Sequence, residues 1–193
     1  VLTIADAVGA VTETDGTGNL TDSGALSFID VDTSDTHTVE VSNQVVTPVG
    51  IALTTDEIAS LTAGITADSD SWDYSVSNSV VERLGKDETI TVTFDVVVND
   101  GTVNSNTESV SLTITGTNDA VAYTQLTPLG TVTEKDGTGN VTDSGALSYI
   151  DVDTSDTHTV EVSKQVMTPV GIALTTDGIA CLTAGYVSVF AFS

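Results

Sequence analysis

The sequence predicts an all-β protein, built as a sandwich of two antiparallel sheets. Apolar and polar residues alternate with period two in several segments, as they do in half-buried strands. Thr, Ser, Val and Asp are abundant among the 193 residues, and they favour strands and turns over helices. No segment suits the crossover helices of a parallel α/β fold. About seven strands in roughly 110 residues is typical of an immunoglobulin-like sandwich.

The strand pattern is clearest in Thr89–Val98 and Ser109–Thr115, and the turn signal Asn99-Asp100-Gly101 lies between these two segments. Val80–Gly85 is expected to form one helical turn that ends at its glycine. In chain order, the predicted strands are Val8–Glu13, Ala25–Asp30, Thr36–Ser42, Gly50–Thr54, Trp72–Val76, Thr89–Val98 and Ser109–Thr115.

The chain contains an internal repeat. Asp15–Asn19 recurs as Asp136–Asn140, an offset of 121 residues (136 minus 15). Residues 11–64 align with residues 132–185 over 54 positions, of which seven differ and 47 are identical. The match ends after Gly185, so the second copy has no counterpart of residues 72–119. We therefore expect a complete repeat over residues 1–119 and a truncated second copy over residues 120–193, with the first strands only and a divergent end at residues 186–193.

A truncated second copy leaves an apolar sheet face uncovered, and half a sandwich rarely folds alone. The divergent end, Tyr186–Phe192, alternates like a strand and is a partial substitute for the missing segment. Alternatively, another chain completes the exposed sheet edge, which predicts a homodimer or strand exchange through residues 170–193. A truncated or frame-shifted sequence would show the same ending, and the sequence leaves these alternatives open.

The charge of the chain limits its partners. Four Lys+Arg against 28 Asp+Glu give a formal net charge of -24. Four cations cannot build the basic patch that nucleic acid or an anionic membrane surface requires, so neither is an expected partner. No run of about 18 apolar residues is present, so membrane insertion is not expected either. Metal cations are the natural counterpart of this charge.

Clustered carboxylates indicate where a cation would bind. Asp30, Asp32 and Asp35 lie within six residues, and the second copy repeats them as Asp151, Asp153 and Asp156. If the segment is extended, Asp30 and Asp32 point the same way and repel each other unless a hard cation with oxygen ligands lies between them. The alternative is that Asp-rich loops simply end strands and remain solvated, because Asp favours turns without any metal.

Several motifs, in order, resemble the VCBS repeat family. Residues 30–38 read DVDTSDTHT, which is similar to the signature of the family. The segments Trp72–Val76, Val80–Leu84, Val96–Gly101 and Thr113–Ala120 follow its pattern, although the family usually has Pro where the chain has Val121. The resemblance covers the first copy and the first half of the second. It implies cadherin-like sandwiches arranged in tandem within secreted bacterial surface proteins, often RTX-type adhesins.

The resemblance also implies calcium ligands. In cadherin-like chains, the junction between repeats holds Ca²⁺ between an Asn-Asp linker, an entering Glu and Asp-x-Asp loops. By this similarity Asn118 and Asp119 form the linker, Glu134 enters the second copy, and Glu13 serves the junction to a preceding repeat. The expected ligands are Glu13, Asp30, Asp32, Asp35, Asp100, Asn118, Asp119 and Glu134, with Asp151, Asp153 and Asp156 as junction or second-copy ligands.

An enzymatic function is not expected. The two histidines, His37 and His158, occupy the same repeat position, between threonines in a predicted strand. The sequence has neither a G-x-S-x-G elbow nor an H-E-x-x-H zinc motif. The one cysteine, Cys181, aligns with Ser60, which argues against a nucleophile.

We therefore expect a calcium-stabilised structural or adhesive module of a secreted protein at the bacterial cell surface. It would act as a rigid extender in cell adhesion or biofilm, next to neighbouring repeats of its parent protein. The alternative is a module that binds a polysaccharide or another surface ligand. Exposed aromatic side chains would form the platform of such a module, but we expect Trp72 to lie in the core.

Overall fold

The computed structural model describes residues 1–126, 130–161, 166–171 and 173. Contacts divide the chain into two units, Val1–Asp156 and Thr157–Ser193. The described residues of the second unit form no helix or strand. The expected partner contact over residues 170–193 lies outside the described residues except at 170, 171 and 173. The repeat boundary after residue 119 stays a prediction.

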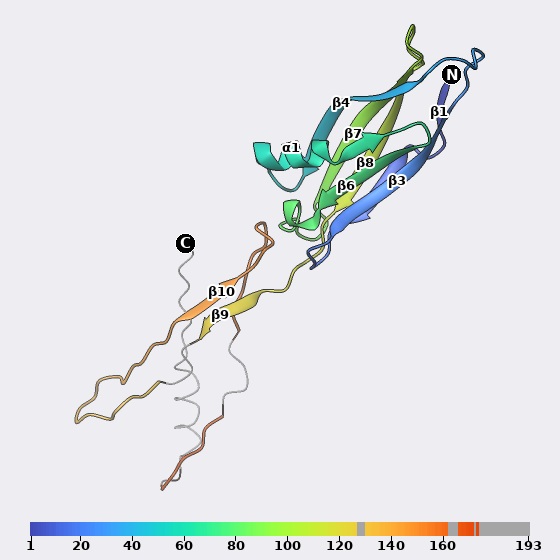
Figure 1. The fold of residues 1–193 in the computed structure, drawn as a ribbon. Coiled ribbons are helices and arrows are strands. Elements are labelled where there is room, and N and C mark those ends of the chain that lie inside the picture. The colour runs from blue at the N-terminus through green and yellow to red at the C-terminus, as the bar shows by residue number, and fades with distance from the viewer. Residues whose placement is uncertain (127–129, 162–165, 172, 174–193) are drawn as a thin grey trace. The chain divides into compact units, whose positions relative to one another are not determined.

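Two four-stranded sheets face each other in the first unit, which confirms the all-β class (Figure 1). The first sheet has the order β1 (Leu2–Ile4), β3 (Asn19–Phe28), β6 (Ser71–Ser77) and β5 (Ile65–Ala67). The second sheet has the order β2 (Val8–Thr12), β8 (Glu108–Thr115), β7 (Thr89–Asn99) and β4 (Thr38–Val49). A two-stranded sheet pairs β9 (Ala122–Leu126) with β10 (Leu147–Ile150).

The hydrophobic core lies between the two four-stranded sheets. Strand β7 buries every second residue from Ile90 to Val98, as its alternating sequence predicts. Trp72 of β6 is fully buried and meets Phe94 of β7 edge to face, with 6.0 Å between ring centroids. Its indole Nε1 donates a hydrogen bond to the carbonyl of Asp6 at 2.7 Å. Trp72 therefore belongs to the core, as predicted, and offers no exposed platform for a ligand.

One strand pairing departs from the expected antiparallel pattern. Strand β2 pairs parallel to β8, with a register that runs from Val8↔Ser111 to Thr12↔Thr115. Because the two strands run in the same direction, the residues that follow them emerge at the same end of the sandwich. Glu13 is thereby placed beside the segment that leads to Asp119.

The strand predictions are most accurate where the alternation is unbroken. Strands β7 and β8 match their predictions to within one residue at each end. Strand β3 begins at Asn19, well before the predicted start at Ala25, and β4 continues past Ser42 to Val49. A register shift between Ser42 and Val45 interrupts the pairing of β4 with β7. This irregularity breaks the period-two pattern, which explains the early end of the prediction.

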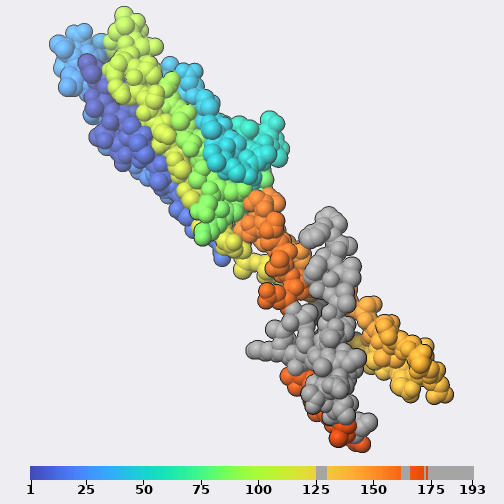
Figure 2. Space-filling view, turned by 180° about the vertical axis from the view of Figure 1, so that it is seen from behind, coloured from blue at the N-terminus to red at the C-terminus, as the bar shows by residue number. Residues whose placement is uncertain are grey.

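The predicted strand Gly50–Thr54 is wrong, and a helix missed in the sequence follows it. Gly50 adopts φ +90°, a left-handed conformation that ends β4. The next turn starts α1 (Thr55–Ala63), where Thr54 and Glu57 form a capping box. Helix α1 packs beside β4 on the outside of the sandwich (Figures 1 and 2). No helix in the described part of the chain is long and apolar enough to cross a membrane.

An ion pair between Glu57 and Arg83 ties α1 to the segment that follows β6. Arg83 Nε donates to Glu57 Oε1 at 2.7 Å, and its Nη2 donates to the carbonyl of Ala52 at 2.7 Å. The hydrogen bond from Arg83 is the main reason that the pKa of Glu57 falls from 4.5 to about 2. The two side chains are only partly exposed, so the pair is screened less than one on the open surface.

We expect Arg83→Met to lower the free energy of unfolding by about 1 kcal/mol at pH 7. Because the folded pKa of Glu57 is depressed, this stabilisation is present above pH 4.5 and is lost as the pH falls towards 2. The difference from wild type in urea titrations should therefore shrink at about pH 2.5. Lys86→Met, which removes an exposed cation, is the control. If Arg83→Met lowered the free energy of unfolding equally at pH 7 and pH 2.5, the ion pair with Glu57 would not be the source of the stabilisation.

Candidate metal centre

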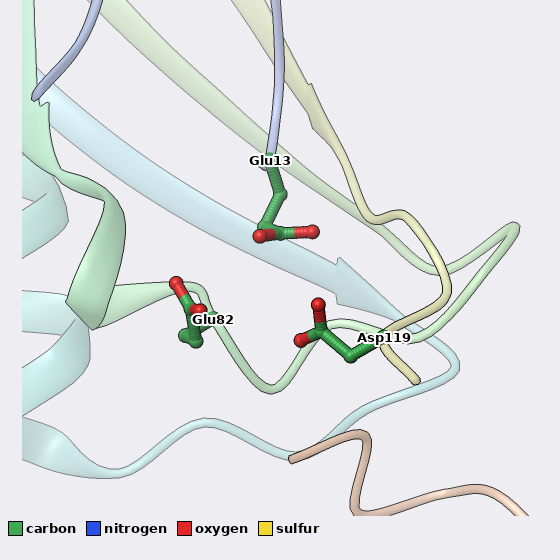
Figure 3. A group of neighbouring side chains, drawn as sticks. All are labelled: Glu13, Glu82 and Asp119. Carbon is green, nitrogen blue, oxygen red and sulfur yellow. The ribbon is translucent and has the colours of Figure 1, made fainter. Parts of the chain in front are cut away.

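Three carboxylates from distant parts of the sequence meet at the end of the sandwich where β2 and β8 finish. Glu13 follows β2, Glu82 follows the short 3-10 helix η1 (Asn78–Val80), and Asp119 follows β8. One oxygen of each lies within 4.8 Å of the others, and the three side chains surround a common space (Figure 3). Glu13 and Asp119 are only 0% and 7% exposed, so like charges are buried together.

The parallel strand pair positions Glu13. Its backbone N–H extends the β2–β8 ladder by donating to the carbonyl of Thr115 at 2.8 Å. Thr117 then donates twice to Glu13 Oε2, from its backbone N–H at 3.2 Å and from its hydroxyl at 2.5 Å. These bonds hold the carboxylate against the segment that leads to Asp119.

Asn78, at the start of η1, is a fully buried side chain that organises the same cluster. Its amide Nδ2 donates to Glu13 Oε1 at 3.3 Å and also donates to Glu82. The same nitrogen also lies 2.5 and 3.0 Å from the carbonyl oxygens of Thr14 and Gly16, so its two hydrogens are shared among four acceptors. Asn78 thus joins two of the acids to the turn after β2, and it orients their oxygens without carrying charge.

A fourth carboxylate comes from the second copy of the repeat. Asp153 is 1% exposed, and its Oδ2 accepts a hydrogen bond from the backbone N–H of Asp119 at 2.7 Å. Asp153 Oδ1 and Asp119 Oδ2 are both buried and have no hydrogen-bond partner within the described residues. Such unpaired buried oxygens are costly, because the water that would solvate them has been removed.

Burial and neighbouring carboxylates disfavour the charged forms of Asp119 and Asp153. Burial, followed by a hydrogen bond with Asp15 and the charges of Glu13, Asp15 and Asp153, raises the pKa of Asp119 to about 7. Burial also raises the pKa of Asp153. Within the described residues, none of the clustered acids has an ion-pair partner: Arg83 pairs with Glu57 instead. Among the described residues, no cation compensates this charge.

The donor set fits a hard divalent cation. Every candidate ligand in the cluster is a carboxylate oxygen, the ligand type that Ca²⁺ prefers. The carboxylate of Asp119 has a buried oxygen without a hydrogen-bond partner in the described residues, and a bound cation would satisfy it. The cluster contains neither thiolate nor imidazole, so it lacks the softer ligands that favour zinc or copper.

A second acidic cluster lies at the opposite end of the sandwich, where the segments near residues 1, 30–37 and 100 gather (Figure 2). Oxygens of Asp30, Asp35 and Asp100 lie within 4.8 Å of one another. Asp30 and Asp100 also line a cavity of about 150 Å³ next to His37. Asp30 and Asp100 are half-buried and Asp35 is exposed, so this cluster is much more open to water than the one at Asp119.

The expectation that Asp30 and Asp32 face each other from an extended segment is wrong. The loop turns here: Asp32 N–H donates to Asp30 Oδ1 at 3.0 Å, and Asp35 N–H donates to the carbonyl of Asp32 at 3.1 Å. The turn brings Asp35 beside Asp30 and leaves Asp32 exposed. His37 lies just before β4, not inside a strand, and its Nε2 is 2.7 Å from Asp30 Oδ2. This hydrogen bond is the main cause that lowers the pKa of Asp30.

The same loop conformation recurs in the second copy. Asp153 N–H donates to Asp151 Oδ1 at 3.1 Å, as Asp32 N–H does to Asp30 Oδ1. Asp156 follows in the equivalent turn and donates to the carbonyl of Asp153 at 3.2 Å. The surroundings differ, because Asp32 is exposed whereas Asp153 is buried against the linker. The turn is therefore encoded locally, and the burial of its middle carboxylate is not.

Glu13 does not serve a junction to a preceding repeat, since its carboxylate lies with Asp119 at the exit from the first copy. The parallel pairing of β2 with β8 is the physical reason. Glu134, its counterpart in the second copy, is exposed and lies in neither cluster. Asn118 is exposed as well, and its Nδ2 donates to the carbonyl of Asp119 at 2.6 Å.

Glu82 of this cluster, and its neighbours Asp15 and Asn78, were not predicted from the sequence. Glu82 belongs to the segment Val80–Leu84, which resembles the VCBS pattern, and no other feature of the sequence singles it out. No spacing in the sequence connects any of the three to Asp119.

Comparisons with known proteins assign no family to the chain. No family model matches it, and no curated protein sequence matches it significantly. The resemblance to VCBS repeats therefore stays a prediction made from the motifs.

We expect Asp119→Asn to raise the free energy of unfolding in EDTA by on the order of 1 kcal/mol at pH 7.5. The amide keeps the shape of the carboxylate but removes its repulsion with Glu13, Asp15 and Asp153. Glu40→Gln, which neutralises an exposed acid on β4, should change stability far less. Chemical denaturation measures both. A destabilised Asp119→Asn protein in EDTA would show that the repulsion is not the governing effect.

Proposed function

We propose that the chain is a calcium-stabilised structural module, part of a tandem array that extends a secreted protein from the bacterial cell surface. The observation that supports this most is the buried carboxylate cluster at the exit from the first repeat. It has partnerless oxygens on Asp119 and Asp153, and no countercharge within the described residues. A cation site made only of carboxylates is chemically suited to Ca²⁺.

The residues that would hold the ion are Glu13, Glu82 and Asp119, and Asp153 lies beside them through its hydrogen bond with the backbone of Asp119. Bound Ca²⁺ supplies the positive charge that cancels their mutual repulsion. Glu13 and Glu82 belong to the first repeat, Asp119 to the linker and Asp153 to the second copy. One ion would therefore join all three parts of the chain and restrict the linker near residues 117–134. Restricting each linker in this way would make a tandem array a stiff extender, which suits adhesion or biofilm.

The surface location and the adhesive role rest on the resemblance to VCBS repeats. The acidic composition is consistent with it, because a net charge of -24 suits an environment with abundant divalent cations. The fold supports the alternative, a module that binds a polysaccharide or another surface ligand, less well. Such a module needs exposed aromatic side chains, and the one tryptophan is buried in the core.

We expect Ca²⁺ to raise the melting temperature of the chain and EDTA to reverse the gain. An ion at about 100 times its Kd stabilises the folded state by about 2.7 kcal/mol through mass action. Differential scanning calorimetry with CaCl₂, MgCl₂ and EDTA measures this, and Mg²⁺ should act more weakly because it gives up its water less readily. In Asp119→Asn most of the gain should disappear, while Glu40→Gln should keep it. Equal melting temperatures with Ca²⁺ and EDTA would exclude the proposal.

A further inference from the structure

The buried amide of Asn78 has more acceptors within reach than it has hydrogens. Its Nδ2 lies 3.3 Å from Glu13 Oε1 and also contacts a carboxylate oxygen of Glu82. The same nitrogen lies 2.5 Å from the carbonyl oxygen of Thr14 and 3.0 Å from that of Gly16. A side-chain amide carries two hydrogens, so two carboxylate oxygens and two carbonyl oxygens compete for them.

The other side of the amide group fixes its orientation. Asn78 Oδ1 accepts a hydrogen bond from Thr14 N–H at 3.1 Å, which a flipped amide could not do. The backbone of Asn78 is held as well, because its N–H donates to the carbonyl of Gly18 at 2.9 Å. The side chain is fully buried, so its NH₂ group faces the carboxylates and has no bulk water to bond with.

Glu82 depends on this amide more than Glu13 does. Thr117 donates twice to Glu13 Oε2, so Glu13 keeps two hydrogen bonds without Asn78. Among the described residues, by contrast, only Asn78 donates to the carboxylate of Glu82. The two acidic side chains come from different elements of the chain (Figure 3). Removal of the amide would therefore release Glu82 from the cluster and leave Glu13 in place.

Negative charge decides which oxygens hold the two hydrogens. A hydrogen bond to an ionised acceptor is roughly twice as strong as one to a neutral acceptor. Without an ion, Glu13 and Glu82 are therefore the preferred acceptors, and the amide draws both carboxylates towards one nitrogen. A cation needs the same convergence, and oxygens of Glu13, Glu82 and Asp119 lie within 4.8 Å of one another.

We propose that Asn78 is a positioning residue that sets the calcium affinity of this carboxylate cluster and transfers its hydrogens to the turn at residues 14–18 when the ion binds. The inference rests on the proposed function and extends it. A bound cation would take up the charge of Glu13 and Glu82, which weakens them as acceptors. The two turn carbonyls would then hold the hydrogens of the amide, and the turn would be more firmly bonded.

The first test measures the Kd for Ca²⁺ by isothermal titration calorimetry on the full chain, at a temperature where each variant is folded. Loss of a group that orients metal ligands typically weakens metal binding 10–100-fold, so Asn78→Ala should raise the Kd by about 10- to 100-fold. A merely structural residue would lower the stability in EDTA and leave this Kd unchanged. The same titration on Asp119→Asn identifies the part of the signal that belongs to the cluster.

Asn43→Ala is the matched control. Asn43 is exposed on β4, has φ +52°, and donates to Asp95 Oδ2 at 2.9 Å. It lies in neither acidic cluster. The replacement removes an amide and its hydrogen bond, so it should lower the stability without changing the Kd for Ca²⁺.

Hydrogen exchange with mass spectrometry tests the transfer of the hydrogens in the wild type, so it does not depend on the folding of a variant. Ca²⁺ should slow amide exchange at residues 15–18, because exchange reports how firmly a segment is held. In Asn78→Ala saturated with Ca²⁺, this protection should be lost. The turn at residues 68–70, between β5 and β6, should exchange equally with Ca²⁺ and with EDTA.

Two outcomes would overturn the inference and leave the proposed function intact. One is a wild type that binds Ca²⁺ at the cluster while exchange at residues 15–18 stays unchanged. The other is a folded Asn78→Ala protein with the Kd of the wild type. A wild type that binds no Ca²⁺ would overturn the proposed function and the inference together, so the first titration distinguishes the two failures.

Discussion

Buried negative charge at the exit from the first repeat is the constraint on which the rest of the first unit depends. The core forces β2 and β8 to run side by side, and the residues that follow them are Glu13 and Asp119. Each buried Val, Leu or Phe side chain contributes about 1.5–3 kcal/mol to the stability of the fold. The packing of the core therefore outweighs the repulsion between the carboxylates that it brings together. Asn78 and Thr117 soften that repulsion with hydrogen bonds but bring no charge. The packing that holds the sandwich together therefore also assembles the cluster, so the proposed ion binding would be coupled to stability.

Local sequence patterns predicted part of this fold. The alternation of apolar and polar residues was enough to predict β7 and β8, because each of these strands buries one face. It failed where the backbone departs from regular pleating, as in the irregular part of β4 and at Gly50. Helix α1 was missed although the sequence contains a capping-box signal, Thr54 followed by Glu57. Leu61 is the one buried residue of the helix and Ile58 is exposed, so the sequence carries too few inward apolar positions for a clear helical period.

Only some residues of the candidate site could likewise be predicted from local sequence patterns. Asp119 and Asp153 were found because Asn-Asp and Asp-x-Asp are visible as local motifs. Glu13 was found but placed at the wrong end, because strand direction depends on a pairing more than a hundred residues away in sequence. Glu82 and Asn78 carry no motif that connects them to the cluster. The Asp30 loop and its second-copy counterpart show the general limit: nearly identical sequence gives the same turn, but only tertiary contacts decide which carboxylate is buried.

The parallel pairing of β2 with β8 also has a mechanical consequence. Strand β2 lies near the beginning of the first repeat and β8 near its end, with five residue pairs between them. A force that pulls the two ends of the repeat apart acts along these parallel strands in opposite directions. The hydrogen bonds between them would then be sheared together, rather than opened one at a time as in a hairpin pulled from its open end. Resistance to stretching thus follows from the topology of one strand pair.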